Sequence, residues 1–174
     1  KPTRFIWKQE IVDLTSGIES GVFVAQPSGD RWLFNVNELM LSVYDKTLIT
    51  NWRGSLSDQG ELQVQSADDF SITPLLPIVG LFSSDLLKQL NLMAPESTIS
   101  DLAIQKRLTG FAAHLRLNEI EWRKSETVPG IKGLNANLYW HKNIGAIQIE
   151  GSDVDLIADN IFPENLSIEN IDVP

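Results

Sequence analysis

Residues 110–150 constrain the fold most, because apolar and polar residues alternate there in three short segments. The alternation covers residues 113–118, 134–140 and 147–150. Its apolar positions are Ala113, Leu115, Leu117, Leu134, Ala136, Leu138, Trp140, Ile147 and Ile149. A β-strand sends successive side chains to opposite faces, so each segment has one apolar and one polar face. Turn-forming residues at 129–130 and 141–143 separate the segments, which therefore predict an antiparallel meander with one apolar face.

Further strand patterns fill most of the remaining chain, with turn signals about every 8–14 residues. The predicted strands lie at residues 3–14, 21–25, 32–44, 48–56, 61–66, 97–105, 152–158 and 166–173. Alternation breaks near Gln9-Glu10, where we expect a bulge. Ser16-Gly17 and Asp45-Lys46 are expected to be turns.

Residues 70–94 differ from these strands, since they are apolar and alternate poorly. Ser84 is a suitable helix N-cap, and Asp85 adds a negative charge in the first turn. We expect an irregular or helical segment at 71–81 and a helix at 84–91 that caps the open end of the sheet or covers one face. The predicted fold is mainly β, a curved antiparallel sheet (meander, open groove or sandwich-like) with one or two short helices around 71–91. Residues 1–174 form a single β-rich domain or an excised section of a longer β-groove protein, with an apolar helical insertion at about 70–94.

Composition restricts the function. The net charge of -9 opposes nucleic-acid binding, which needs clustered Lys and Arg. The absence of cysteine excludes disulfides and thiol catalysis. The sequence has no apolar run of about 18 residues, and it begins with Lys1, so we expect any targeting signal or anchor to lie outside it.

No motif of a hydrolase, phosphate-binding loop, dinucleotide-binding site or zinc protease occurs. His114 and His141 occupy polar or turn positions, where a surface role is expected. Asp153 and Asp155 are interpreted as the polar face of an alternating strand. We therefore expect no enzyme activity, no metal and no cofactor.

Three stretches carry a resemblance to a known family. They are GELQVQSADDFSITPLLPIVGLFSSDLLKQL, then ISDLAIQ, then LRLNEIEWRKSETVPGIKGLNANLYWHKNIGAIQIEGSDVDLIADNIFPENLSIENIDV. In this order they resemble the periplasmic region of the YhdP proteins of Gram-negative bacteria, an AsmA-like family. The resemblance covers about residues 60–174, and the first 60 residues fit in pattern.

The resemblance implies a periplasmic location in a protein anchored in the inner membrane by a single span. It also implies a long β-structured groove with an apolar interior that conveys phospholipid toward the outer membrane and supports envelope integrity. Phospholipid, or its acyl chains, is thus the expected partner. The expected groove-lining residues are Leu62, Val64, Leu115, Leu117, Leu138, Trp140, Ile147 and Ile149.

Two alternatives stay open, because period-two alternation does not distinguish an open groove from a filled core. The first is a closed β-sandwich that acts as a structural or protein-interaction module. The second is a carbohydrate-binding sandwich, which requires two or three exposed, coplanar tryptophans among Trp7, Trp32, Trp52, Trp122 and Trp140.

Overall fold

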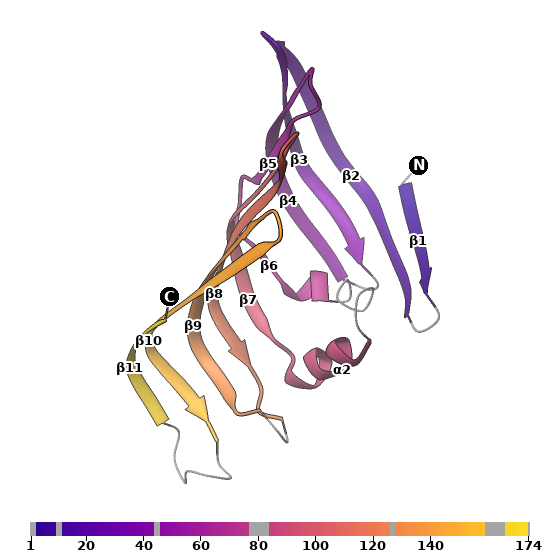
Figure 1. Cartoon of the computed structure of the whole chain (residues 1–174). Coiled ribbons are helices and arrows are strands. Elements are labelled where there is room, and N and C mark those ends of the chain that lie inside the picture. Colours follow the sequence, from indigo (N-terminus) through magenta and orange to yellow (C-terminus); the bar gives the residue numbers. More distant parts are fainter. Residues whose placement is uncertain are drawn as a thin grey trace.

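The computed structural model describes residues 3–9, 12–43, 46–76, 84–125, 128–158 and 166–173. Within them, one antiparallel sheet contains ten strands that neighbour one another in the order β1-β2-β3-β4-β5-β7-β8-β9-β10-β11 (Figure 1). The strands are β1 (Thr3–Gln9), β2 (Val12–Ser28), β3 (Arg31–Val43), β4 (Lys46–Ser57), β5 (Leu62–Ser66), β7 (Glu96–Arg107), β8 (Gly110–Trp122), β9 (Gly130–His141), β10 (Ile144–Ile157) and β11 (Leu166–Val173). The two-residue strand β6 (Phe70–Ser71) pairs with β7. The prediction of a mainly β, curved antiparallel sheet is confirmed, in its open form.

Several predicted strand ends are wrong. Residues 3–14 do not form one strand with a bulge, because β1 and β2 pair antiparallel with Gln9 opposite Val12. Ser16-Gly17 is not a turn, since β2 continues through it and Gly17 pairs with Arg4 on one side and Ser42 on the other. Pairing with β1 on one side and β3 on the other keeps the backbone of Gly17 in the extended conformation of a strand. Lys46 is already the first residue of β4, and Asp45 lies outside the described residues.

Residues 147–150 and 152–158 are predicted as separate segments, yet the first and all but the last residue of the second belong to β10 (Ile144–Ile157). The regular pairing with β9 ends at Gly151 and resumes at Asp155 after a register shift. Asp153 lies in this irregular part with a φ of 58°. The predicted regular polar face with Asp153 and Asp155 is therefore interrupted by a bulge.

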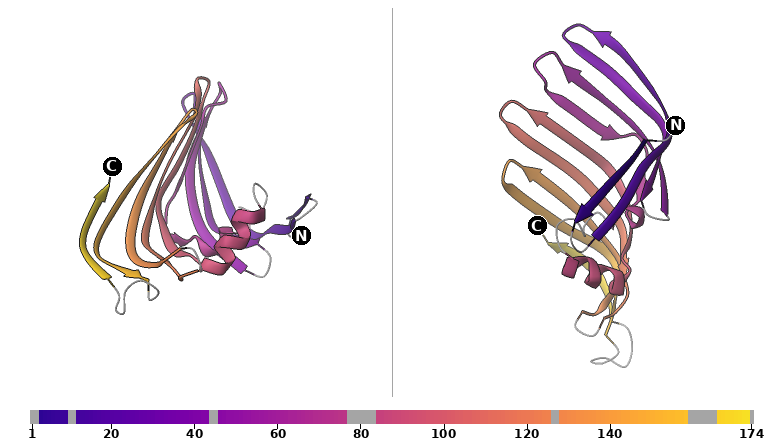
Figure 2. Two further views of the ribbon diagram at one scale, coloured as in Figure 1. Left: turned by 60° about the horizontal axis from the view of Figure 1, so that its bottom comes forward. Right: turned by 90° about the vertical axis from the view of Figure 1, so that its right-hand side faces the viewer.

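The same irregularity recurs in three other strands. Glu38, Asp101 and Glu119 also have positive φ angles, of 51°, 52° and 52°, and each lies beside a register shift. All four acidic residues follow Asn or Ser and precede an aliphatic residue, in Asn37-Glu38-Leu39, Ser100-Asp101-Leu102, Asn118-Glu119-Ile120 and Ser152-Asp153-Val154. Bulges bend strands and increase their twist, and the sheet is strongly curved (Figure 2).

Two of these bulges are held by the same contact. The backbone N–H of Glu38 donates to Oδ1 of Asn51 on β4 at 2.6 Å, and that of Glu119 donates to Oδ1 of Asn135 on β9 at 3.0 Å. A bulge leaves a backbone group outside the regular ladder, so these asparagines supply the missing acceptor. The recurring tripeptide thus marks where the sheet bends.

The chain between β5 and β7 lies inside the curve of the sheet (Figures 1 and 2). It contains β6, the short 3-10 helix η1 (Thr73–Leu75) and the helix α2 (Ser84–Met93). The predicted helix at 84–91 is therefore two residues longer, and η1 lies in the segment predicted as irregular or helical, of which residues 77–81 lie outside the described part. We call residues 70–76 the strap. Its Phe70 forms a buried cluster with Leu48 and Ile99.

Candidate functional site

The register of the sheet assigns side chains to its two faces, because directly paired residues of neighbouring strands point to the same side. One row of paired residues crosses β3, β4, β5, β7, β8, β9 and β10. It consists of Phe34, Gly54, Val64, Ile104, Ala113, Trp140 and Gly145. We call the face that carries this row the inner face. No polar side chain interrupts this row, so it forms a continuous apolar line across these strands.

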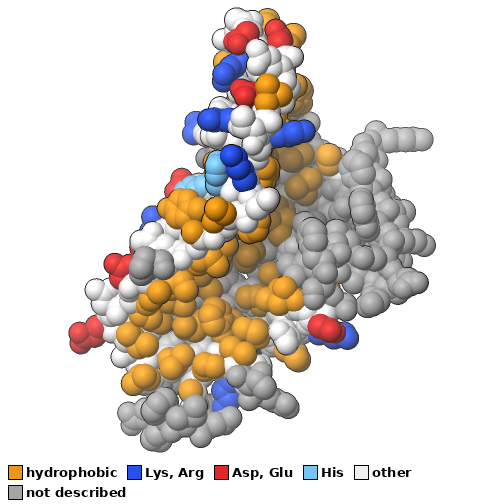
Figure 3. Space-filling view, viewed as in Figure 1, with side chains coloured by type: hydrophobic (Ala, Val, Ile, Leu, Met, Phe, Trp, Pro, Cys, Tyr) orange, Lys and Arg blue, Asp and Glu red, His pale blue; other side chains and the backbone are white. Residues whose placement is uncertain are grey.

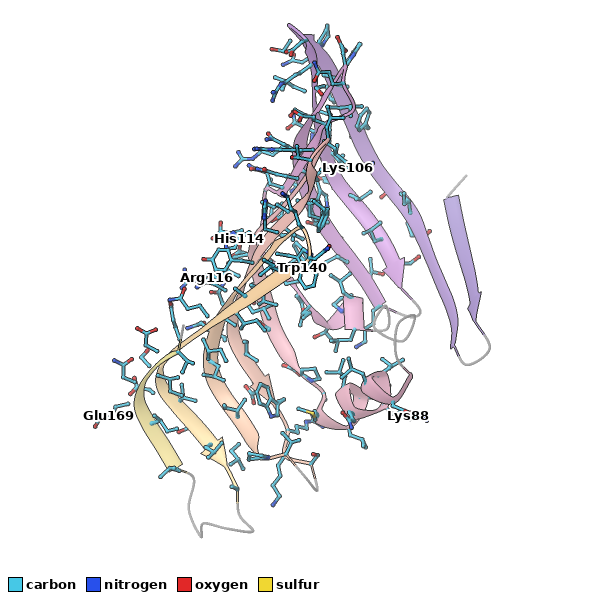
Figure 4. All side chains as sticks on the ribbon, in the orientation of Figure 1. Lys88, Lys106, His114, Arg116, Trp140 and Glu169 are labelled. Atoms are coloured by element: carbon cyan, nitrogen blue, oxygen red, sulfur yellow. The ribbon has the colours of Figure 1, made fainter. Side chains whose placement is uncertain are left out.

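The neighbouring row of the inner face is nearer the hairpin tips. It passes from Trp32 through Leu56, Leu62 and Lys106 to Phe111. Lys106 is the exception in this row, and Figure 4 places its side chain near the tips, above Trp140. A lysine there can keep its ammonium group in water while its stem lies along apolar neighbours.

The eight expected groove-lining residues all belong to the inner face. Leu62, Val64 and Trp140 lie in the two rows above, and two further rows join Leu115, Leu138 and Ile147, and Leu117, Ala136 and Ile149. The structure brings Leu115, Leu138, Trp140 and Ile147 together around a hollow of about 560 Å³. Leu117 does not border this hollow. It packs against the buried cluster beneath the strap, and Leu115 contacts both the hollow and that cluster.

The strap divides the inner face into a packed part and an open part. Beneath it, Trp52 packs against Phe70 with ring centroids 5.9 Å apart. Toward the hairpin tips, large apolar side chains stay accessible, with 49% of Trp32, 49% of Trp140 and 57% of Ile147 exposed. Hydrophobic side chains cover much of the surface that Figure 3 shows, including the region below these tips. We call this accessible strip of the inner face the open lane.

Trp140 has a fixed orientation in the open lane. Its Nε1 donates to the backbone oxygen of Lys142 at 2.7 Å, and its ring lies over Gly145 on β10. A Cβ atom at position 145 would approach the indole to 2.8 Å, closer than carbon atoms normally pack. Gly145 therefore makes the space in which the tryptophan ring forms one wall of the hollow.

In the part of the chain that the structure describes, the histidines and acidic residues do not converge on a reaction centre. His114 lies on the opposite face and stacks on Tyr139, with ring centroids 4.6 Å apart (Figure 4). Asp155 accepts a hydrogen bond from Ser167 at 2.6 Å instead of meeting a histidine. No group of three or more His, Asp or Glu in the described residues could hold a metal ion. None of the described helices is long and apolar enough to cross a membrane.

The list of expected groove-lining residues lacks the bulge residues that curve the sheet and two residues that line the hollow. Glu38, Asp101, Glu119 and Asp153 look like ordinary polar-face residues in an alternating pattern, and only the recurrence of the tripeptide around them indicates bulges. Phe111 and Gly145 also belong to the hollow although neither is among the expected lining residues. Phe111 is in phase with Ala113 and Leu115, so extending the alternation by two residues would have found it.

The comparison with protein families decides the assignment. The model of the YhdP protein family matches residues 1–174. The chain belongs to the YhdP family. The match to the family model therefore extends beyond residues 60–174, where the resemblance in sequence lies, and includes the first 60 residues. Searches of curated proteins and of solved structures found no match. The YhdP family is associated with the periplasm and the cell envelope, and it is not a known enzyme family.

Proposed function

We propose that this chain is a non-enzymatic periplasmic section of an AsmA-like protein anchored in the inner membrane, and that its inner face conveys phospholipid toward the outer membrane. The observation that carries the proposal is the unbroken apolar row from Phe34 to Gly145. Membership in the YhdP family supports it.

The open lane supplies the driving force for holding an acyl chain. Complete burial of one methylene group of an acyl chain stabilises the bound state by about 0.8 kcal/mol. A trough that is open on one side buries each methylene group only in part and gives a part of that value. Large exposed apolar patches on a soluble surface mark sites that bind lipid, ligand or protein. The open lane is a patch of this kind. Its residues Trp32, Trp140 and Ile147 each keep about half of their surface accessible.

The same surface leaves the position of an acyl chain weakly specified. The hydrophobic effect is non-directional, and the row from Phe34 to Gly145 offers no polar side chain that would fix a lipid at one point. A chain can then shift along the row at little cost in free energy. This property suits transfer better than storage.

The closed β-sandwich gains no support, because a single open sheet accounts for all strands in the described part of the chain. A sandwich would cover the inner face with a second sheet. Among the described residues, the strap instead packs on the part around Leu48, Phe70 and Ile99.

A pair of adjacent substitutions tests the proposal. Ile147→Glu places a charge in the open lane, whereas Gln148→Glu places the same charge on the opposite face of the same strand. Phospholipid that co-purifies with the protein is measured by mass spectrometry. We expect wild type and Gln148→Glu to carry phospholipid and Ile147→Glu to lose most of it. A wild-type protein without phospholipid, or an Ile147→Glu variant that keeps it, would contradict the proposal.

A further inference from the structure

The face opposite the inner face has an unusual charge distribution. Two neighbouring rows cross β2, β3, β4, β5, β7, β8, β9 and β10 there. The first contains Gln26, Leu33, Ser55, Gln63, Gln105, Ala112, His141 and Ile144, and the second Val24, Asn35, Arg53, Gln65, Ala103, His114, Tyr139 and Ala146. We call these two rows the polar band. Neither contains a carboxylate, although the chain has 23 Asp and Glu residues and a net charge of -9.

The polar band is hollowed along its length. Two depressions of about 370 and 350 Å³ share Ala103 and Gln105, and a third of about 120 Å³ shares Gln105 and adds Arg107. Alanines at 103, 112 and 146 make the floor low between longer side chains. Gln105 borders all three depressions, and we call them together the trench.

The trench presents groups that recognise hydroxyls and anions. Gln63, Gln65 and Gln105 each carry an amide donor and an amide acceptor, the two groups that match a hydroxyl, and the amides of Gln65 and Gln105 also contact arginines. The guanidinium of Arg53 faces the side-chain amide of Gln65, and that of Arg107 donates to Oε1 of Gln105 at 3.2 Å. Arginine binds carboxylates and phosphates through paired hydrogen bonds.

A flat aromatic surface lies at one end of the trench. The His114 ring stacks on Tyr139 at an interplanar angle of 13°, and Tyr139 is 46% exposed. Nε2 of His114 is buried and has no hydrogen-bond partner. Figure 4 shows His114 and Arg116 on the side of the ribbon away from Trp140, so the stacked rings lie on the face opposite the open lane, although His114 and Tyr139 also border the hollow beside Trp140.

The shape and chemistry restrict the occupant. Strands about 4.8 Å apart give the part of the trench from β3 to β9 a length on the order of 24 Å, which suits an extended chain. A peptide strand adds to a sheet at an edge, where backbone groups are free, whereas these central strands have their backbone paired on both sides. Recognition here must use side chains alone. We propose that the polar band binds an extended acidic glycan, whose hydroxyls meet the amides, whose acid groups meet Arg53 and Arg107, and whose ring face lies on Tyr139.

Titration calorimetry with a polygalacturonate oligosaccharide tests this site, with a dextran oligosaccharide of equal length as the neutral probe. Gln105→Glu puts a carboxylate at the centre of the trench, and Gln89→Glu makes the same change on the exposed surface of α2. We expect wild type and Gln89→Glu to bind the acidic glycan alike and Gln105→Glu to bind it about tenfold more weakly, a loss of ~1.4 kcal/mol. Tyr139→Ala should weaken both oligosaccharides, and dextran should bind more weakly than polygalacturonate throughout.

Three results would overturn the inference. The first is no binding of the acidic glycan to wild type. The second is an equal loss in Gln105→Glu and Gln89→Glu, which would indicate attraction to overall charge. The third is polyglutamate binding with the same affinity and the same dependence on Gln105 and Tyr139, which would indicate an acidic-peptide surface. Thermal unfolding confirms that each variant is folded. The lipid measurement on Ile147→Glu is independent of all these outcomes.

Discussion

Glu119 occupies a backbone conformation that glycine usually takes. Its φ is 52°, where an L-residue meets steric conflict between Cβ and the backbone. Its N–H has a defined acceptor in Asn135, so the fold holds the residue there despite the strain. The side chain at this position therefore affects stability mainly through the backbone.

Substitution of Glu119 tests this account. We expect Glu119→Val to cost about 1–2 kcal/mol in the free energy of unfolding, because a β-branched residue is poorly tolerated at positive φ. Glu119→Gly should be neutral or stabilising. Glu121→Val in the same strand, at an exposed position, is the matched control and should cost under about 1 kcal/mol, because it removes only a surface ion pair with Lys132. Equal effects of valine at 119 and 121 in urea unfolding would disprove the strain.

Thr50 is a polar residue in an apolar setting. It is 1% exposed, and its hydroxyl has no hydrogen-bond partner in the described structure. An unpaired buried hydroxyl is unfavourable, whereas an apolar group of the same shape is not. We expect Thr50→Val to raise the free energy of unfolding by about 1 kcal/mol. The exposed Thr47→Val should have no such effect, and a destabilised Thr50→Val would show that the hydroxyl has a partner after all.

At the scale of elements, the sequence predicts faces better than ends. Alternation at 113–118 and 134–140 identifies inner-face residues of β8 and β9, because burial on one side acts on every second residue. Strand ends depend on pairing with distant segments. Residues 3–14 therefore look like one strand although they belong to two, and β10 looks like two strands although it is one.

The strap is the element whose packing the sequence specifies least. Its apolar residues are compatible with an end cap or with cover over one face, and the structure shows them on the inner face around Leu48 and Ile99. Local pattern gives no information about which strands a connecting segment will contact.

Phe70 is expected to fasten the strap. It is 6% exposed, so Phe70→Ala removes a buried ring and should cost about 3–5 kcal/mol in urea unfolding. Phe23→Ala is the control, because Phe23 is 65% exposed and its truncation should cost far less. A Phe70→Ala variant as stable as the Phe23 control would mean that the strap is not packed on the sheet in solution.

For the whole molecule, one open sheet with one apolar face explains both the architecture and the proposed role. The bulges at Glu38, Asp101, Glu119 and Asp153 curve the sheet, and the strap covers part of its concavity. The described residues leave the open lane accessible, and Trp32, Trp140 and Ile147 line it. Alternation alone did not distinguish this lane from a sealed core, because both require the same apolar positions.

Photo-crosslinking in living cells tests the central claim most directly. A photoreactive amino acid replaces Leu115, Leu138 or Ile147 on the inner face, or the sequence neighbours Arg116, Asn137 or Gln148 on the opposite face. The account predicts that labelled phospholipid crosslinks at the three inner positions and not at their neighbours. Crosslinking at both sets alike, or at neither set in a folded protein, would contradict it.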